Sequence, residues 1–364
     1  MIPVNDLKRG FELFRNEYEA KALDVLRSGW YILGNEVNEF EKEFAKALGM
    51  DCYAAGVDNG LNAIHLGLIA AGIEAEDEVI VQANGYIATI LGVIQCGAIP
   101  VFVEPDLTFN MNADLIEDAI TDKTKAVLIT HLYGQASNMR KIQNVCEKNA
   151  LLLFEDCAQS HFASFDDQYT GTFGTAGFYS FYPTKNLGGF GDGGAVVSKN
   201  KNIIDRVKVL RNYGSDYRYH NIQLGYNARL DEIQAGLLRV KLRHYKELIN
   251  NRRKYANKYL REIKNRKIKL PVISNDSTHV WYQFVIMVEE RKKFIDYMFQ
   301  NEIKVDINWE TPPYLQPAML KYGYHRGDFP ITEKICDCIV SLPMMDDMSD
   351  SELEQIISAV NLYG

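Results

Sequence analysis

The chain has 364 residues, of which 47% are hydrophobic and 24% are charged, and its formal net charge at pH 7 is -8. These proportions are typical of a soluble globular protein, and the length allows one large domain and one smaller domain. The negative charge argues against non-specific binding to nucleic acid or to an anionic membrane, whereas a local positive cluster remains compatible with a phosphorylated ligand.

The chain opens with residues that are polar and charged from position 5 onward, which predicts no signal peptide. The longest apolar stretch, residues 86–103, is interrupted by Gln95, Gly97 and Pro100, so it predicts a helix, a turn and a strand instead of a membrane span. Six scattered cysteines indicate a reduced, cytoplasmic setting. A lone C-x-C at residues 336–338 has no second pair of ligands nearby, so we predict no metal site.

Short apolar runs alternate with helical segments from about residue 56 to residue 198. The predicted strands are 78–81, 101–103, 126–130, 151–154, 177–181 and 195–198, and the helices between them include 61–71, 87–96 and 114–120. Continuous Val/Ile/Leu runs separated by helices predict a mostly parallel sheet that is covered on both faces. Ligands bind such sheets at the carboxyl ends of the strands, where His131, Tyr133, Gly134 and Asp156 fall.

The second half of the chain begins with a long helical pattern over residues 229–262. It leads to a segment that predicts a strand at 279–288 and a final helix at about 349–362. We therefore expect a large α/β domain over residues 1–240 and a small α+β domain over residues 241–364.

Two neighbouring segments carry the chemistry. Asp156 follows a buried apolar run, and Lys185 lies between a strand-like segment and a glycine-rich loop. A carboxylate at a strand end can keep the pyridine nitrogen of pyridoxal phosphate protonated, and a lysine can hold the aldehyde as a Schiff base. Taken singly, Asp156 is also explained as a helix cap, and Lys185 as a solvated surface lysine. Together they predict a pyridoxal phosphate enzyme.

Other side chains suit the same cofactor. Ser180 at a strand end and the free amides of Gly60 and Leu61 at a helix start are suited to a phosphate. The amide of Gln159 can bond the phenolic oxygen of the ring, and Tyr86 can stack on the ring. A plain helix start at residues 60–61 and a core or rim role for Tyr86 are the alternatives.

The glycine-rich loop also matches G-x-G-x-x-G at Gly189, Gly191 and Gly194. A dinucleotide site requires this pattern after a strand and at the start of a helix, whereas here it precedes a strand, so that interpretation is disfavoured. We expect these glycines to let the backbone approach a flat ring closely.

In combination, these segments resemble the DegT/DnrJ/StrS family of pyridoxal phosphate-dependent sugar-nucleotide aminotransferases. The similarity runs through SGWYILGNEVNEFEKEFA, VDNGLNAI, THLYGQ, FEDCAQSH, SFYPTKNLGGFGDGGA, GYNARLDEIQAGLL and PPYLQP. The resemblance implies fold type I: a large domain with a mixed, mostly parallel sheet of seven strands, and a smaller C-terminal α+β domain.

The resemblance also implies roles for the residues around the ring. Lys185 would form the Schiff base and move the proton between substrate and cofactor, and Asp156 would pair with the pyridinium nitrogen. Gln159 would bond the ring hydroxyl, and Tyr86 would stack on the ring.

For the phosphate, the resemblance implies Ser180, the amides of Gly60 and Leu61, and Asn227 from the neighbouring subunit. The active unit is therefore expected to be a homodimer with active sites at the subunit interface. Many family members have Ser-Gly-Thr where this chain has residues 59–61, so one hydroxyl to the phosphate is missing.

The implied reaction is amino transfer from L-glutamate to a nucleotide-linked keto-sugar. Within the family, the sequence looks most similar to enzymes that aminate dTDP-3-keto-6-deoxyhexoses to the 3-amino-3,6-dideoxy sugars of lipopolysaccharide or other surface polysaccharides. The residues expected to contact the nucleotide-sugar are Trp30, Tyr31, Tyr182, Tyr213, His220 and Tyr314.

One further departure and three alternatives accompany this prediction. Asn308 and Trp309 stand near the place of a common His-Tyr-Pro motif, which leaves the sugar open. A 4-keto-6-deoxy sugar nucleotide or a cyclitol is the alternative substrate, and a non-catalytic regulatory protein with the same fold is the alternative class. A related dehydratase branch has histidine in place of Lys185 and is disfavoured.

Overall fold

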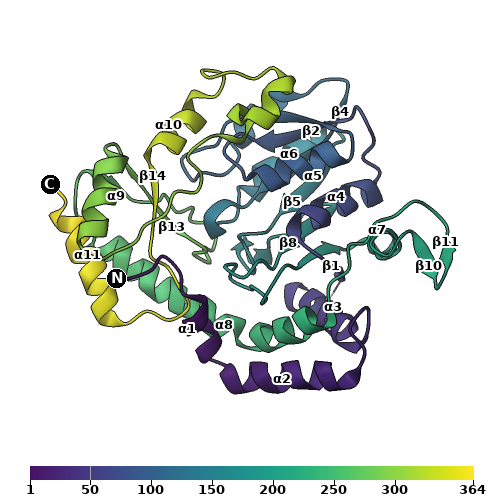
Figure 1. The fold of residues 1–364 in the computed structure, drawn as a ribbon. Coiled ribbons are helices and arrows are strands. Elements are labelled where there is room, and N and C mark those ends of the chain that lie inside the picture. The colour runs from purple at the N-terminus through teal and green to yellow at the C-terminus, as the bar shows by residue number, and fades with distance from the viewer. Residues whose placement is uncertain (50) are drawn as a thin grey trace.

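A seven-stranded sheet forms the centre of the computed structural model, which describes residues 1–49 and 51–364 (Figure 1). Its strands are β1 (Tyr53–Val57), β2 (Glu78–Gln82), β3 (Ile99–Val103), β4 (Thr124–Thr130), β5 (Leu152–Asp156), β8 (Ala176–Ser180) and β9 (Gly194–Ser198). They lie in the order β1-β9-β8-β5-β4-β2-β3, and β9 alone runs in the direction opposite to the other six strands. The expected mixed, mostly parallel sheet is confirmed.

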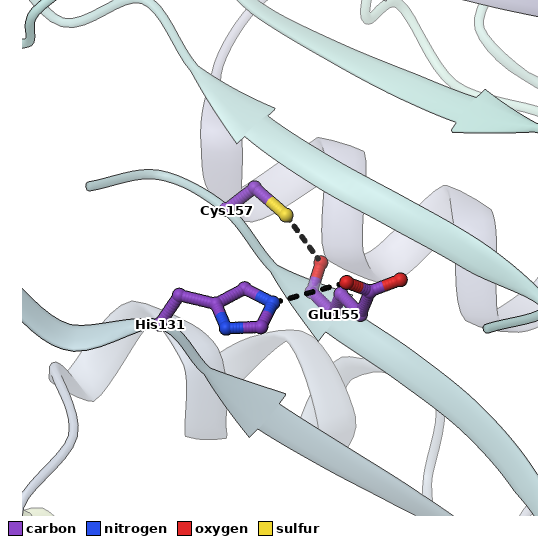
Figure 2. A group of neighbouring side chains, drawn as sticks. All are labelled: His131, Glu155 and Cys157. Atoms are coloured by element: carbon purple, nitrogen blue, oxygen red, sulfur yellow. Dashed lines mark hydrogen bonds and ion pairs between the residues drawn. The ribbon is translucent and has the colours of Figure 1, made fainter. Parts of the chain in front are cut away.

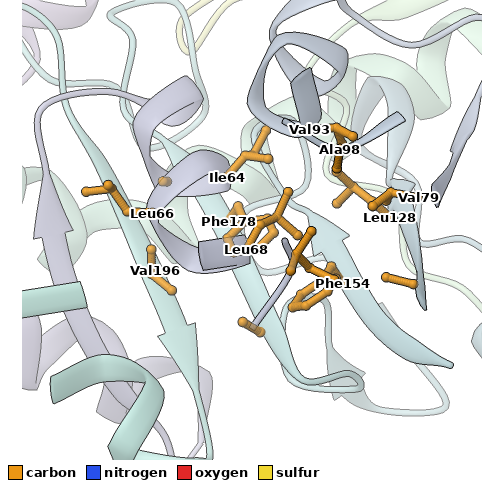
Figure 3. Packing of buried hydrophobic residues seen from close by; sticks show 14 of the residues in the cluster. Ile64, Leu66, Leu68, Val79, Val93, Ala98, Leu128, Phe154, Phe178 and Val196 are labelled. Carbon is orange, nitrogen blue, oxygen red and sulfur yellow. The ribbon is translucent and has the colours of Figure 1, made fainter. Parts of the chain in front are cut away.

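Both faces of the sheet are buried, which explains the continuous apolar runs of its strands. Helices α4 (Gly60–Ala71), α5 (Ile87–Gln95) and α7 (Lys201–Leu210) cover one face, and α3 (Asn35–Leu48), α6 (Met139–Lys148) and α8 (Glu232–Glu262) cover the other. Phe154 and Phe178 pack beneath α4 beside Leu68 (Figure 3). At Gly67 of α4, a Cβ would lie only 2.2 Å from the Phe178 ring, so a glycine is needed for this close contact.

A second, smaller sheet has its own core. It contains β12 (Ile268–Lys269), β13 (Phe284–Val288) and β14 (Ile339–Leu342), all antiparallel, with helices α9 (Arg291–Gln300), α10 (Pro330–Cys338) and α11 (Asp350–Leu362). Ile2 packs into this core and pairs with Ile303. Helix α8 runs from the first core to the second, and the expected boundary at residue 240 lies inside it.

Smaller elements complete the chain. Helices α1 (Leu7–Glu12) and α2 (Arg15–Ser28) lie along α8, and β6 (Ser164–Phe165) pairs with β7 (Gln168–Tyr169). The hairpin of β10 (Ser215–Tyr217) and β11 (His220–Asn221) projects from the body of the molecule (Figure 1). Within the described ranges, none of the helices has the length and apolar character needed to cross a lipid bilayer.

Two predicted elements differ from the structure. The helix expected at 114–120 is a pair of 3₁₀ turns, Ala113–Leu115 and Glu117–Ala119, because the segment is short and the Asn112 side chain bonds the amide of Asp114. The strand expected from residue 279 begins at Phe284, because the amides of Val280 and Gln283 bond the loop that follows β4.

Candidate active site

A cavity of about 650 Å³ opens at the carboxyl ends of β5 and β8. It collects residues that lie far apart in the sequence. Of the residues predicted to act in catalysis or cofactor binding, Gly60, Leu61, Tyr86, Asp156, Gln159, Ser180 and Lys185 line it. The convergence of these side chains at one sheet edge is the arrangement that the strand pattern predicts.

Asp156 is the last residue of β5 and is buried, with 4% of its surface exposed. The Thr89 hydroxyl donates to Asp156 Oδ2 at 2.5 Å, and the Ala158 amide donates to Oδ1 at 3.0 Å. Burial raises the pKa of Asp156, against the opposing effects of Thr89, Ala158 and the Lys185 charge. A buried carboxylate needs a cationic partner, and a protonated ring nitrogen is such a partner. Sequence reasoning missed Thr89, which stands three residues after Tyr86 without a motif of its own.

Gln159 is oriented by the loop that follows β4. The backbone amide of Tyr133 donates to Gln159 Oε1 at 2.7 Å, so this oxygen already accepts a hydrogen bond within the chain. No hydrogen bond among the described residues uses Gln159 Nε2, which leaves this nitrogen as a donor at the cavity wall. A donor here is what the phenolic oxygen of the expected ring requires.

The N-terminus of α4 and the end of β8 together form an anion-binding corner. The Asn59 side chain caps the amide of Asn62 at 2.8 Å, whereas the amides of Gly60 and Leu61 have no hydrogen-bond partner among the described residues. A Cβ added to Gly60 would lie 2.7 Å from Ser180 Cβ and 3.2 Å from Ser180 Oγ. A glycine is therefore needed to bring the free amides and the hydroxyl together, and the corner fits a phosphate.

Lys185 is presented by the loop between β8 and β9. Its amide donates to the Tyr182 carbonyl at 2.8 Å, and the side chain of Asn186 next to it donates to the Val280 carbonyl at 2.8 Å. The Lys185 ammonium lies 4.4 Å from the centre of the Tyr282 ring. Residues 280–282, which lie between α8 and β13, therefore help to hold the loop that carries Lys185, and sequence reasoning missed this contribution.

The glycines after Lys185 allow close packing of their own loop. A Cβ at Gly188 would lie 2.3 Å from the Pro183 carbonyl, and at Gly191 it would lie 2.8 Å from the side chain of Gln234 on α8. These glycines let the loop close on itself and pack against α8. Gly194 opens β9, so the G-x-G-x-x-G match precedes a strand as expected.

The opposite wall of the cavity comes from the N-terminal segment and the smaller domain. It is formed by Val4, Asn5, Tyr282, Gln283, Asp306, Asn308, Trp309 and Met344. Trp309 stacks on Tyr86 with ring centres 4.9 Å apart. The only sequence signal for this wall was the departure from the common motif at Asn308 and Trp309.

Of the residues expected to contact the nucleotide-sugar, Tyr182 lines the cavity. Trp30, Tyr31, Tyr213 and His220 are exposed and lie outside it. Tyr314 also lies outside the cavity: its ring is fully buried, and its hydroxyl lies 3.0 Å from Glu333 Oε1.

Asn227 is exposed in the segment that follows the hairpin and does not line the cavity of its own chain. Its backbone pairs with Asn212.

A buried trio lies beside the site: His131, Glu155 and Cys157 (Figure 2). By residue type the three could ligate a metal, yet their polar atoms take part in hydrogen bonds within the chain. The Glu155 carboxylate accepts from the amides of Gly171, Phe173 and Gly174 at 2.6–2.9 Å. It also contacts His131 Nε2 at 3.0 Å, while Ser137 donates to His131 Nδ1. Burial raises the pKa of the Cys157 thiol far above its ordinary value. Glu155, which also contacts His131, therefore holds the loop at residues 171–174 against the sheet.

Comparison with known proteins points to one family. A profile of the DegT/DnrJ/EryC1/StrS aminotransferase family matches residues 13–361. The chain is 44% identical to a dTDP-3-amino-3,6-dideoxy-alpha-D-galactopyranose transaminase of Aneurinibacillus thermoaerophilus, over the full length of both chains. It is 37% identical to a dTDP-3-amino-3,4,6-trideoxy-alpha-D-glucose transaminase of Streptomyces venezuelae, with 99% of this chain and 95% of that protein covered. Its fold matches the crystal structure of S. venezuelae DesV in complex with a ketimine intermediate, with a TM-score of 0.97, 37% identity and coverage of 99% and 97% of the two chains.

Proposed function

The chain belongs to the DegT/DnrJ/EryC1/StrS aminotransferase family and is a pyridoxal phosphate-dependent sugar-nucleotide aminotransferase, and from this premise we propose its substrates. The amino donor is L-glutamate. The acceptor is a dTDP-3-keto-6-deoxyhexose, which becomes a dTDP-3-amino-3,6-dideoxyhexose. The observation that carries the proposal is the convergence of Lys185, Asp156, Gln159 and Ser180 on one cavity.

We propose that Lys185 carries the proton in both half-reactions. Its amine takes the proton from the α-carbon of glutamate and later gives a proton to C3 of the sugar. When bound, the cofactor supplies an electron sink for the charge that develops on these carbons. Asp156 keeps the ring nitrogen protonated, because a buried carboxylate that accepts from Thr89 and Ala158 is fixed in position to receive that charge.

The remaining residues orient the cofactor. The amides of Gly60 and Leu61 and the hydroxyl of Ser180 hold the phosphate, since the helix N-terminus and the hydroxyl meet in one corner. Gln159 Nε2 donates to the phenolic oxygen, and Tyr86 covers the ring. Trp309 narrows the entrance by stacking on Tyr86, which helps to exclude water from the reacting atoms.

The choice of a 3-keto acceptor rests on the relatives. The A. thermoaerophilus protein, at 44% identity, and the S. venezuelae protein, at 37%, are both named for 3-amino sugars carried on dTDP. We propose a role in the supply of amino sugars for lipopolysaccharide or another surface polysaccharide, in the cytoplasm.

We also propose that the active unit is a homodimer. Asn227 and the aromatic residues of the projecting hairpin, Tyr217 and Tyr219, are exposed in the single chain. A partner subunit would cover these side chains and receive Asn227 at its phosphate corner. Four other predicted sugar contacts also lie outside the cavity of the chain that carries them: Trp30, Tyr31, Tyr213 and His220. Any contact of these residues with the nucleotide-sugar would therefore be made across the interface.

The test is the visible absorbance of cofactor-loaded protein before and after L-glutamate is added. We expect loss of the yellow absorption of the lysine-bound cofactor, and its return when a dTDP-3-keto-6-deoxyhexose is supplied. A protein that responds to glutamate and recovers only with a 4-keto sugar would overturn the 3-keto assignment. A protein that binds the cofactor and ignores every donor would overturn the catalytic role.

A further inference from the structure

Two carboxamide side chains, those of Gln283 and Asn308, are bonded to each other in the cavity wall formed by the smaller domain. Gln283 Nε2 donates to Asn308 Oδ1 at 2.7 Å, and the Ser341 hydroxyl donates to the same oxygen at 3.1 Å. The Tyr133 hydroxyl donates to the backbone carbonyl of Asn308 at 2.6 Å. The pair is therefore held from three sides, which is more than a solvated surface amide needs.

This amide pair keeps one acceptor and one donor unpaired. Gln283 Oε1 is buried and has no hydrogen-bond partner among the described residues, and none of their hydrogen bonds uses Asn308 Nδ2. Turning both amides over exchanges the two atoms but still leaves one donor and one acceptor. A hydroxyl group both donates and accepts, so it matches this pair better than a carbonyl or an ether does. Gln283 is partly exposed as a whole, and the terminal torsion of a glutamine is soft, so its free atom would reach a ligand if the amide turned about this torsion on binding.

The position of the amide pair indicates which hydroxyl it binds. Gln283 and Asn308 line the same cavity as Lys185, and the ring centre of Tyr282, next to Gln283 in the chain, lies 4.4 Å from Lys185 Nζ. If the reacting carbon is C3, its ring neighbours are C2 and C4. A nucleotide attached at C1 and extending toward the open end of the cavity would leave the opposite ring edge, which carries C4, facing the wall that holds Gln283 and Asn308.

We propose that the Gln283–Asn308 amide pair binds the C4 hydroxyl of the keto-sugar and makes the enzyme select sugars that keep this hydroxyl. The inference rests on the proposed 3-keto-sugar function. It also separates two product classes that differ in the oxygen at C4: 3-amino-3,6-dideoxyhexoses, which retain it, and 3-amino-3,4,6-trideoxyhexoses, which lack it.

The experiment measures binding, so it does not depend on turnover. Calorimetry on the cofactor-loaded Lys185→Ala protein gives the Kd for dTDP-3-amino-3,6-dideoxygalactose and for dTDP-3-amino-3,4,6-trideoxyglucose. We expect the first to bind about 10- to 100-fold more tightly, because the second leaves buried polar atoms without partners. Adding Gln283→Leu should weaken binding of the hydroxylated sugar alone and leave Kd for the 4-deoxy sugar within about twofold. The control is Gln143→Leu on α6, which removes a partly exposed glutamine with one amide hydrogen bond outside the cavity and should change neither Kd.

Each other outcome contradicts the proposal. If the Lys185→Ala protein binds the two sugars equally tightly, the enzyme does not select for the C4 hydroxyl. This result is obtained with Gln283 intact, so it does not depend on how well the Gln283 variant folds. If Gln283→Leu weakens the binding of both sugars equally, the amide pair binds a group that the two sugars share, such as the C2 hydroxyl. If neither sugar binds tightly, and the cofactor absorbance of the wild-type protein does not change with glutamate, the proposed function is wrong and the inference fails with it.

Discussion

The hydroxyl of Thr89 donates to Asp156 Oδ2 at 2.5 Å, and both residues are buried. Thr89 belongs to the first turn of α5, so the helix that follows Tyr86 carries the group that orients the Asp156 carboxylate. Hydrogen bonding favours the ionised form of a carboxylate, whereas burial disfavours it. Thr89 thus helps to keep Asp156 in the form that its proposed role requires.

Replacement of Thr89 is expected to weaken the enzyme without removing its chemistry. Thr89→Val keeps the shape of the side chain and deletes the donor, and a hydrogen bond to a charged group contributes about 1.5–3 kcal/mol. We expect kcat/KM to fall about 10- to 100-fold and the cofactor to bind more weakly, while Thr89→Ser restores most of both. Equal loss in the valine and serine variants would show that the methyl group, and not the hydroxyl, matters.

Asp156→Asn should have opposite effects on the apo protein and on the enzyme. Burial raises the pKa of Asp156, so the folded protein binds this proton more tightly than the unfolded chain does. The stabilising contribution of the protonated carboxyl is complete below the ordinary carboxyl pKa of about 3.9 and is lost as the pH rises through the raised pKa. Without cofactor, Asp156→Asn should therefore melt at a higher temperature than the wild type at pH 7, and this advantage should shrink toward acid pH.

The same variant should be slow once the cofactor is bound. Loss of the charge that stabilises the protonated ring should reduce kcat by about 10²- to 10³-fold, as for other preorganised electrostatic groups. Melting curves across pH and single-turnover rates measure the two effects. A variant that is less stable than the wild type without cofactor, at every pH, would contradict the assigned role of burial.

Gly60→Ala should damage the phosphate corner specifically. The new Cβ would lie 2.7 Å from Ser180 Cβ, so the helix start and the strand end must separate. We expect the Kd for pyridoxal phosphate to rise by at least about tenfold, with a smaller effect on pyridoxal, which has no phosphate to lose. Gly10→Ala in α1 is the matched control, because its Cβ would meet no atom closer than 3.9 Å. Equal losses for the two cofactor forms would place the damage elsewhere.

Mixed dimers test whether Asn227 serves the partner subunit. Lys185→Ala removes the catalytic amine, and Asn227→Asp places a negative charge where the phosphate is expected. If Asn227 acts across the interface, a mixed dimer has one intact site, with Lys185 from one subunit and Asn227 from the other. Random reassortment of equal amounts then gives about a quarter of wild-type activity, because half of the dimers are mixed and each has one good site. If the mixed sample is no more active than the two variants measured separately, Asn227 acts in the site of its own subunit or lies outside the site altogether.

Much of the fold was predictable because both faces of the sheet are buried. Strands such as β4 and β5 are therefore continuous apolar runs. Asp156, the last residue of β5, follows such a run and lines the cavity. The expected helix at 114–120 was wrong because a short acidic segment was governed by side-chain bonds to the backbone. β1 was missed, since its small residues, Ala54, Ala55 and Gly56, leave only a weak apolar signal.

That the predicted cofactor-binding residues other than Asn227 would line one cavity was predictable for a different reason: each lies at, or within five residues of, a strand end or a helix start. The opposite wall was not, because Asn5, Tyr282, Gln283 and Asn308 come from irregular segments of two distant parts of the chain. Their side chains meet only through tertiary packing. Thr89 was not predicted for the same reason, because its hydrogen-bond partner, Asp156, lies 67 positions away in the sequence.

The last two residues of β5 have a consequence for folding fidelity. Glu155 and Asp156 are both buried acids on opposite faces of the strand, and each has its own set of donors. A slip of one position in the pairing of β5 would point each carboxylate at the donors meant for the other, three amides in one case and a threonine hydroxyl in the other. Such a misaligned sheet would contain two poorly solvated charges and would be strongly disfavoured. The acidic dipeptide thus favours the correct alignment of β5, and the same alignment directs Asp156 into the cavity.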